Sequence, residues 1–528
     1  MRALLLSIPL LALCVAATAC AEECPGGFVF EDRNGNGVRD AGERGIAGVK
    51  VSDGERIVTT AADGRWRLPP MDGRTIFMIK PAGHDAANRR DGLPDIWIHQ
   101  QAQAGPALKY GGIPAAPAAC RDFALRRRSA GDAEDLDVLV FADTQTASVR
   151  QIDYYWRDIV QPLVGQHGAR LGMTLGDVVN DDLSLYPQLL RTTMSLGIPW
   201  MHVPGNHDLD FDAASDEDSL RSYRQHLGPD TYAWEESRMV FIGLDDVIYR
   251  PGQKPAYVGG LREDQFAFLR AYLPTVPKDR LLVLGVHIPL FWGDPQRETF
   301  RREDRDRLFA LLKDFPHVLV LSGHNHTQRH WYHDGSTGWQ GAAPLHEYNV
   351  GAACGAFWSG VKDGSGIPDA TMADGTPNGY ARLTVKPGGA YALGWHPARE
   401  TDDRGIGLHA PRVLRQGAYP AFGVYANVYM GQDDSRVEFR VDEGPWQPMK
   451  RVERADPRLV LENVRDETAQ TLRGYDRSPE AEPSAHLWRG ALPTSLPAGE
   501  HRIEVRTQDP WRGELRAGTT YTLQSASE

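Results

Sequence analysis

A series of short motifs in the middle of the chain contains residue types that bind metal ions and move protons. In chain order they are Asp143-Thr144-Gln145, Gly176-Asp177, Gly205-Asn206-His207-Asp208, the isolated His287, and Gly323-His324-Asn325-His326. Carboxylate, amide and imidazole groups are ligands of divalent transition metals. Two such ions can generate a nucleophile, offset charge on a transferring phosphoryl group and stabilise the leaving oxygen. The motifs therefore predict a two-metal centre that cleaves phosphate esters.

Each motif follows an apolar segment that is typical of a β-strand. These segments lie at residues 138–141, 170–175, 200–203, 239–242, 281–284 and 318–321. Segments with the helical period, such as 152–164 and 302–313, lie between them. Alternating apolar strands and helices predict an α/β domain whose sheets are covered by helices. Open α/β sheets place ligands at the carboxyl ends of their strands, where these motifs fall.

The residue types also suggest individual roles. Asp177 is expected to bridge two metals, and Asn206 offers a neutral carbonyl oxygen. His324 and His326 are two residues apart in a loop just past a strand, so they can diverge toward different metals. Gly176, Gly205 and Gly323 allow the backbone to approach closely or to adopt positive φ.

At this point the motifs resemble those of the calcineurin-like metallophosphoesterase superfamily, whose core is a β-sandwich flanked by helices. The resemblance implies one metal held by Asp143, Asp177 and His326, and a second held by Asp177, Asn206, His287 and His324. It implies two divalent transition metal ions (Mn, Fe or Zn) and attack by a metal-bound hydroxide. His207 would protonate the leaving alkoxide, and Asp208 would orient His207.

The sequence departs from the family pattern at Gln145, where histidine is common. A glutamine carbonyl oxygen can ligate the first metal, although it is a weaker donor than imidazole. Alternatively, Gln145 hydrogen-bonds a metal-bound water. The other ligands are intact, so the departure concerns the occupancy and identity of one metal rather than the existence of the site.

Residues 350–360, 366–369, 372–375 and 377–380 resemble a bacterial secreted branch of the superfamily, in which β domains flank the enzyme. Phe357, Trp358 and Tyr380 are candidates for a substrate platform near the metals. A packed loop beneath the second β domain accounts for the same residues equally well.

The flanking regions are rich in short alternating segments and turns. Residues 24–128 and 405–528 are each predicted to form an all-β sandwich. They enclose a central α/β metallophosphoesterase domain over residues 135–400. The fold class is therefore multidomain, with an N-terminal and a C-terminal β-sandwich around the catalytic domain.

A separate motif at residues 32–43 has the spacing of a calcium-binding loop. Gly37 stands at the sixth position, where the loop turns sharply, and the oxygen ligands would be Asp32, Asn34, Asn36, Asp40 and Glu43. The flanks are predicted strands rather than helices, so this is not an EF-hand. One structural Ca²⁺ is expected, and an Asx/Gly turn without an ion is the alternative.

The first residues predict export. Residues 1–21 have the charge, apolar core and small-residue end of a signal peptide. Cleavage after Ala19 or Ala21 and lipidation of Cys20 both fit, so the protein is placed in the periplasm or at the outer membrane or cell surface. In an oxidising compartment Cys24 and Cys120 can pair, although unpaired buried thiols fit the sequence too. Cys354 is not predicted to be a nucleophile.

Charge and composition limit the classes of partner. The chain has 58 Lys and Arg against 70 Asp and Glu, which argues against a nucleic-acid binder. Bound metals can still attract an anionic substrate. The sequence therefore predicts an exported phosphate mono- or diester hydrolase whose substrate derives from a glycan or lipid. The alternatives are a surface binding protein with a decayed core and a pyrophosphate-cleaving hydrolase. The oligomeric state is open.

Overall fold

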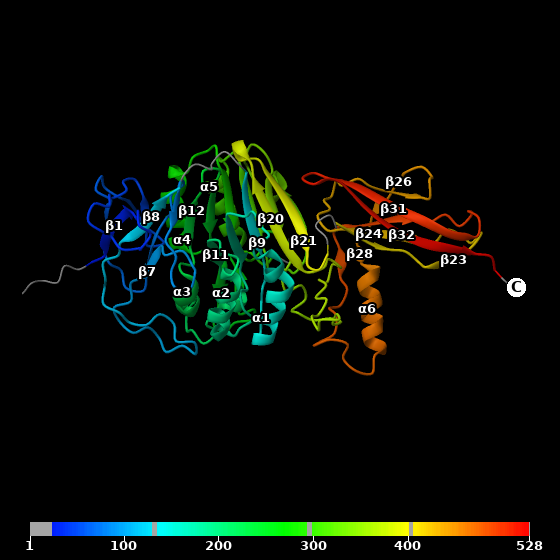
Figure 1. Cartoon of the computed structure of the whole chain (residues 1–528), viewed down its shortest axis with the longest axis horizontal. Coiled ribbons are helices and arrows are strands. Elements are labelled where there is room, and N and C mark those ends of the chain that lie inside the picture. Colours follow the sequence, from blue (N-terminus) through cyan, green and yellow to red (C-terminus); the bar gives the residue numbers. More distant parts are fainter. Residues whose placement is uncertain (1–23, 129–134, 293–297, 401–404, 527–528) are drawn as a thin grey trace, which may run out of the picture.

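The computed structural model describes residues 24–128, 135–292, 298–400 and 405–526. The chain forms an elongated row, with a small β region at one end, a large central α/β region and a second β region at the other (Figure 1). The predicted signal peptide and Cys20 lie outside the described residues. Among the residues described, no helix combines the length and the apolar character that crossing a membrane requires.

The N-terminal region is a sandwich of two four-stranded sheets. One sheet has the order β4 (Arg65–Arg67), β1 (Gly26–Glu31), β8 (Phe123–Arg127) and β6 (His84–Ala86). The other has the order β3 (Ile57–Thr59), β2 (Lys50–Ser52), β5 (Thr75–Met78) and β7 (Trp97–His99). Trp66 stacks on Phe123 inside it. Cys24 and Cys120 form a disulfide at the two ends of this region.

The central region contains two larger sheets. One has the order β11 (Trp200–Val203), β10 (Leu171–Leu175), β9 (Leu136–Phe141), β20 (Gly379–Val385) and β21 (Tyr391–Pro397). The other has the order β12 (Tyr232–Glu235), β13 (Met239–Gly243), β16 (Leu281–Gly285), β17 (Val318–Ser322), β19 (Leu345–Asn349) and β18 (Arg329–His333).

The motif-bearing strands are parallel within each sheet. β9, β10 and β11 pair in parallel, as do β13, β16 and β17. Their carboxyl ends therefore meet at one edge, where the motifs begin. The two sheets pack face to face. Gly285 of β16 in one sheet lies so close to Val203 of β11 in the other that a Cβ at Gly285 would be 3.2 Å from the Val203 side chain.

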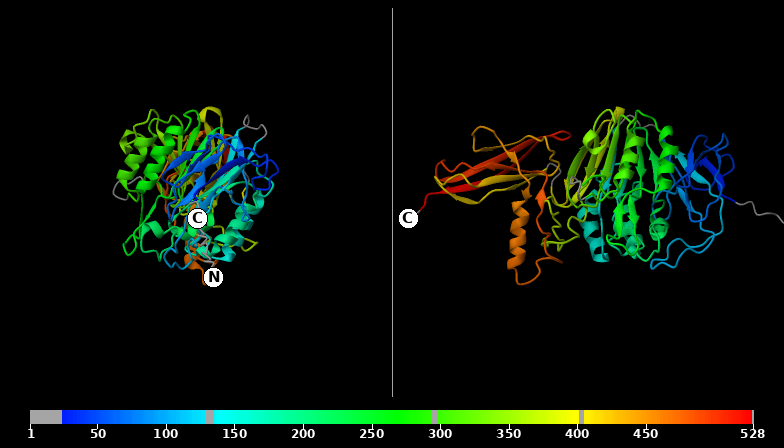
Figure 2. Two further views of the ribbon diagram at one scale, coloured as in Figure 1. Left: turned by 90° about the vertical axis from the view of Figure 1, so that its left-hand side faces the viewer. Right: turned by 180° about the vertical axis from the view of Figure 1, so that it is seen from behind.

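Helices flank these sheets (Figure 2). They are α1 (Val149–Tyr155), α2 (Tyr186–Met194), α3 (Arg221–Leu227), α4 (Glu263–Tyr272) and α5 (Arg302–Leu312). The helix expected over residues 152–164 begins earlier, at the N-cap Ser148. After Tyr155 it continues as a π-helical turn and a 3-10 turn that contains Pro162. Proline has no backbone N–H, so regular α-helical bonding cannot continue through it.

The C-terminal region is a second sandwich with its own core, which includes Phe439, Trp488 and Ile503. One sheet has the order β22 (Ile406–His409), β24 (Gly423–Val428), β30 (Leu487–Ala491) and β27 (Lys450–Arg451). The other has the order β23 (Val413–Arg415), β32 (Gly513–Gln524), β31 (Gly499–Asp509), β25 (Val437–Val441) and β26 (Gln447–Pro448). The all-β prediction for residues 405–528 does not include α6 (Pro457–Thr468), which projects beside the sandwich (Figure 1).

The N-terminal and central regions share one hydrophobic core. Phe77 of β5 packs against Phe268 of α4, with ring centroids 6.1 Å apart. Next to this contact, the buried Lys80 ammonium is paired with the Glu236 carboxylate, which also accepts a hydrogen bond of 2.8 Å from Arg128. The two regions are therefore held together by apolar packing around a buried ion cluster.

This cluster gives a test of the packing. We expect Glu236→Ala to destabilise the fold by about 3–5 kcal/mol, because it leaves the Lys80 charge buried without its carboxylate. The measurement is the denaturant midpoint of unfolding. Glu443→Ala is the matched control, since the Glu443 side chain is 96% exposed, and should change stability by at most about 0.5 kcal/mol. Equal effects of the two substitutions would contradict a bonding role for Glu236.

Candidate metal centre

Asp177 lies at the centre of the site, just past the end of β10. Its Oδ1 accepts a 2.8 Å hydrogen bond from the His207 backbone N–H and lies 3.3 Å from His287 Nε2. Its Oδ2 accepts a 3.2 Å hydrogen bond from Gln145 Nε2. The two carboxylate oxygens thus face opposite sides of the site, which is the arrangement a bridging ligand requires.

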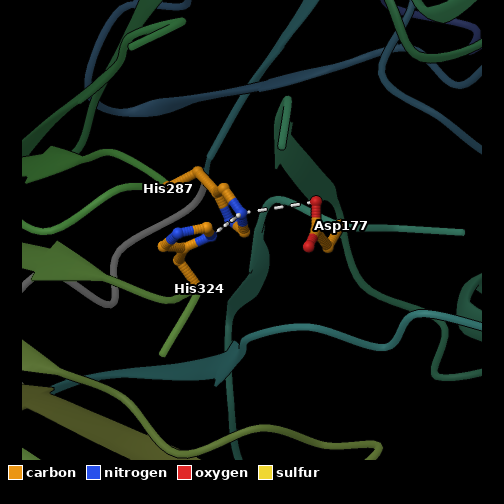
Figure 3. A group of neighbouring side chains, drawn as sticks. All are labelled: Asp177, His287 and His324. Atoms are coloured by element: carbon orange, nitrogen blue, oxygen red, sulfur yellow. Dashed lines mark hydrogen bonds and ion pairs between the residues drawn. The ribbon is translucent and has the colours of Figure 1, made fainter. Parts of the chain in front are cut away.

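On one side of Asp177, imidazole and amide groups converge from three different strand ends. The His287 Nδ1–H donates to the Leu175 carbonyl at 2.9 Å, which leaves Nε2 to face Asn206 Oδ1 at 3.0 Å. His324 Nδ1 lies 3.3 Å from the same Nε2. Asp177, His287 and His324 offer ligand atoms within 4.8 Å of one another (Figure 3).

On the other side, Asp143 faces His326, with 3.5 Å between Asp143 Oδ1 and His326 Nε2. The His326 Nδ1–H donates to the Gly355 carbonyl at 2.7 Å, so Nε2 is again the nitrogen directed into the site. A backbone carbonyl bound to the far ring nitrogen is a common way to fix the orientation of a metal-binding histidine. The sequence-predicted ligands are thus brought together in two groups that meet at Asp177.

The backbone is strained at these positions. Positive φ values occur at the non-glycine residues Asp143 (48°), Gln145 (38°), Asp177 (47°), His324 (73°) and His326 (50°). Such conformations cost about 1–3 kcal/mol each and persist where surrounding contacts hold them. At Gly205 of the third motif, a Cβ would clash with the Asp177 carboxylate. The motif glycine is therefore needed for close approach to the bridging side chain.

Asp208 has a different role from the one predicted. It is fully buried, and its carboxylate accepts hydrogen bonds from the backbone N–H groups of Val178 at 3.1 Å and Gly205 at 2.9 Å. The Tyr186 hydroxyl donates to it at 2.9 Å. The prediction that Asp208 orients His207 is wrong, because the carboxylate points back into the loop. It fixes the backbone beside Asp177 instead.

Asp181 is the residue that contacts the predicted acid. Its Oδ1 lies 2.8 Å from His207 Nδ1, which leaves His207 Nε2 for a leaving group. Burial lowers the pKa of His207, but Asp181 and Asp177 outweigh burial and raise it above its usual value. Asp181 lies four positions after Asp177 and follows the same strand. This position of an acidic residue is the signal in the sequence that could have identified it as the partner of His207.

Asp246 is a further residue that the sequence reasoning missed. Its carboxylate accepts the backbone N–H groups of His287 and Ile288, both at 2.9 Å, and burial raises its pKa well above the usual value. It holds the His287 backbone as Asp208 holds that of Val178. Its position after the apolar segment 239–242 was the signal in the sequence.

The electrostatics of the site favour a cation. Burial alone would raise the pKa of Asp177, but His287 and His207 outweigh it, and the pKa falls below the usual range. Burial alone would lower the pKa of His287, but Asp177, Asp143 and Asp246 raise it to about 10. The buried carboxylates therefore attract positive charge strongly. Together with the imidazole and amide donors, they fit divalent transition metal ions.

The structure also gives a specific position for Gln145. Its Nε2 donates to Asp177, and its Oε1 lies 3.7 Å from the buried Cys354 sulfur. The same sulfur lies 3.8 Å from His326 Nδ1. In this orientation the Gln145 amide nitrogen supports the Asp177 carboxylate, and the Gln145 amide oxygen faces Cys354. Sequence reasoning did not link Cys354 to the site, because more than 200 residues separate it from Gln145.

The predicted substrate platform is only partly formed. Phe357 is 52% exposed, and its ring centroid lies 4.6 Å from that of His326. Trp358, by contrast, is fully buried, and its Nε1–H donates to the Thr144 carbonyl at 3.0 Å. The prediction that Trp358 contacts substrate is wrong, because the indole is buried and bonds to the backbone of the first motif. Tyr380 packs against Phe141 and His396.

The calcium-like loop closes on itself. Asp40 Oδ2 accepts hydrogen bonds from the side-chain amides of Asn34 at 2.7 Å and Asn36 at 2.8 Å. Asp32 accepts the backbone N–H groups of Gly35 and Gly37, and Glu43 accepts those of Arg33 and Asp40. The loop oxygens are thus gathered as the spacing predicts, and Ca²⁺ binding stays a prediction.

Comparison with known proteins identifies the class. Family models match successive segments of the chain: the N terminal of calcineurin-like phosphoesterase at residues 33–109, calcineurin-like phosphoesterase at 136–328, and the C terminal of calcineurin-like phosphoesterase at 347–514. The chain belongs to the calcineurin-like phosphoesterases. The family recognition and the multidomain fold class are confirmed, and the family is one of phosphoesterases.

The individual relatives share less than 30% sequence identity with this chain over the aligned residues. The glycerophosphodiester phosphodiesterase GpdQ of Enterobacter lignolyticus is 29% identical over 29% of this chain and 54% of its own length. A probable GpdQ of Arcobacter nitrofigilis is 28% identical over 29% of this chain and 54% of its length. The chain thus spans about half the length of these relatives. The purple acid phosphatase PPD1 of yellow lupin has 11% identity and a TM-score of 0.38, with 66% of this chain and 67% of that chain covered.

Metal analysis tests the unequal roles of Asp177 and Gln145. We expect Asp177→Asn to abolish tight binding of a metal pair, because it weakens the ligand shared by both ions. Gln145→Ala should keep the binding stoichiometry but weaken affinity about 10- to 100-fold, as expected for a residue that supports a ligand. The measurement is Mn²⁺ bound per chain across a titration, with exposed Gln340→Ala as the control. Loss of one ion in Gln145→Ala would instead show direct ligation.

Proposed function

We propose that the protein hydrolyses phosphate diesters with two divalent metal ions. The observation that carries this proposal is the convergence of Asp177, His287, Asn206 and His324 around one buried centre. A bound pair of ions would supply Lewis-acid activation of the phosphate and of an attacking water. Asp143, Asp177 and His326 would hold one ion, and Asp177, Asn206, His287 and His324 the other.

The residues of the chain have complementary tasks. The buried aspartates Asp208 and Asp246 hold the ligand loops, so the ligands are oriented before substrate binds. His207 is partly exposed and directs Nε2 away from Asp181, which suits proton donation to a leaving alkoxide. The exposed Phe357 ring beside His326 offers an apolar surface at the rim.

The preference for diesters over monoesters is supported by the relatives. Both relatives described above are named as glycerophosphodiester phosphodiesterases, the second as a probable one. His207 is placed to protonate the alcohol that a phosphate ester releases, whether the ester is a mono- or a diester. A glycerophosphodiester, derived from lipid, is therefore the first substrate class to test.

The rival functions make different demands on the site. A binding protein with a decayed core would have no need to retain the strained ligand loops or the His207–Asp181 contact. A pyrophosphate-cleaving hydrolase would use the same centre with a phosphate leaving group, which needs less help from a proton donor. The intact donor pair thus favours ester hydrolysis.

We also propose that the protein works outside the cytoplasm. The Cys24–Cys120 disulfide supports this, because such bonds persist in oxidising compartments. Lipidation at Cys20 and free secretion both remain compatible with it.

A substrate panel tests the proposed reaction. With Mn²⁺, Fe²⁺ or Zn²⁺ added, we expect hydrolysis of glycerophosphocholine and bis(p-nitrophenyl) phosphate to exceed that of p-nitrophenyl phosphate and of a nucleotide sugar. His207→Ala should slow glycerophosphocholine hydrolysis about 10²- to 10⁴-fold, the usual contribution of a general acid. His84→Ala, in the N-terminal sheet, is the matched control.

Two outcomes would overturn the proposal. Metal binding without hydrolysis of any substrate would favour the binding protein. Faster cleavage of the nucleotide sugar than of either diester, with phosphate-terminated products, would favour pyrophosphate cleavage.

A further inference from the structure

The connection between β7 and β8 reaches out of the N-terminal sandwich toward the catalytic region. In Figure 1 it is the light-blue segment that runs below the sandwich toward α3. We call residues 101–117 the strap. Leu108 and Tyr110 of the strap pack against the shared hydrophobic core. The strap therefore belongs to the N-terminal region in sequence but lies against the catalytic region.

The strap is held at two points by α3. The Arg221 guanidinium donates to Gln101 Oε1 at 2.8 Å, and the Gly112 backbone N–H donates to Ser222 Oγ at 3.2 Å. Between these contacts, the Lys109 backbone N–H donates to Asp212 Oδ2 at 2.7 Å. Asp212 follows the His207 motif by a few residues, so the strap is fixed to the loop that carries the proton donor.

At its middle, the strap contacts the partner of that donor. The Tyr110 hydroxyl donates to the Asp181 backbone carbonyl at 2.9 Å and accepts a hydrogen bond of 2.7 Å from Lys109 Nζ. Asp181 in turn is bonded to His207 twice, through its backbone N–H to the His207 carbonyl at 3.2 Å and through its carboxylate to Nδ1 at 2.8 Å. The backbone N–H and the carboxylate of Asp181 are thus bonded to His207, and its backbone carbonyl is bonded to the strap.

Asp181 needs such restraint because its backbone is in the left-handed region, with φ of 63°. A non-glycine residue keeps this conformation only where contacts with the surrounding structure hold it. The segment around Asp181 lies at the surface and would otherwise be free to relax. Relaxation would move the carboxylate and with it the His207 ring.

We propose that Tyr110 is a positioning residue through which the N-terminal domain fixes the proton donor for the leaving group. This inference rests on the proposed phosphodiesterase function. It gives the N-terminal domain an indirect part in the reaction: the Tyr110 hydroxyl holds Asp181, and Asp181 holds His207. The effect is specific to the leaving-group side, because Tyr110 contacts Asp181 and the Lys109 backbone contacts Asp212, and neither residue is a predicted metal ligand.

The consequence is a dependence on the leaving group. An alkoxide is a poor leaving group and needs the proton in the transition state, whereas p-nitrophenolate departs without one. Loosening His207 should therefore slow alkyl diesters and spare aryl diesters. A general disturbance of the fold or of metal binding would slow both by the same factor.

Tyr110→Phe tests this directly, because it removes one hydroxyl and keeps the ring. We expect kcat for glycerophosphocholine to fall about 3- to 10-fold, as expected for one lost hydrogen bond, while kcat for bis(p-nitrophenyl) phosphate changes less than about twofold. Tyr419→Phe is the matched control, since Tyr419 is 84% exposed in the C-terminal region. Equal slowing of both substrates, or slowing of neither, would overturn the proposal.

Hydrogen exchange gives a second readout that does not need activity. The Asp181 amide bonds to the His207 carbonyl, so we expect the peptide containing it to exchange faster in Tyr110→Phe and unchanged in Tyr419→Phe. Exchange at the wild-type rate in Tyr110→Phe would overturn the proposal. If the wild-type protein cleaves neither substrate, the proposed function fails, and the exchange result still decides the contact on its own.

Discussion

The buried carboxylate of Asp177 is the interaction on which the rest of the site depends. It sits in a strained backbone conformation, accepts a backbone N–H from His207 and a side-chain amide from Gln145, and faces His287. A buried charge is costly unless it is paired and hydrogen-bonded. The surrounding histidines and the expected metal ions supply that pairing, so the fold and the metal centre stabilise each other.

Each region of the chain contributes to this arrangement. The parallel strands bring the motifs to one edge, and buried aspartates fix the loops that follow. The N-terminal strap reaches the loop of His207, the proposed proton donor. The C-terminal region contributes through His486, which pairs with Asp374 of the central region at 3.1 Å. Asp374 in turn accepts the Gln328 backbone N–H, just beyond His326. The flanking β regions therefore support the catalytic loops as well as enclosing the central domain.

Sequence reasoning was most successful where chemistry is local. The ligand motifs combine glycine with Asp, Asn and His after apolar strands, and the structure gathers them as that pattern indicates. It was least successful for contacts across the fold. Whether Asp208 or Asp181 meets His207 depends on how two loops turn after their strands. The link from Gln145 to Cys354, the burial of Trp358 and the reach of Tyr110 arise from packing between distant segments, which periodicity does not reveal.

Helix α6 illustrates a different limit. Its N-terminus has a clear signal, Asp456 as N-cap followed by Pro457, yet the surrounding pattern of short strands favoured an all-β interpretation. Val460, Leu461 and Val464 recur at the three- and four-residue spacing of a helix, although their side chains are exposed in the fold. The helical signal was therefore present in the sequence, and the strands around it outweighed it.

Electron paramagnetic resonance of the Mn²⁺-loaded protein tests the central claim most directly. Two Mn²⁺ ions that share the Asp177 carboxylate would lie about 3.5–4 Å apart. We expect a spin-coupled signal that reaches its maximum at two ions per chain. Only the signal of isolated ions at that loading, or saturation at one ion per chain, would contradict Asp177 as the bridge between two metals.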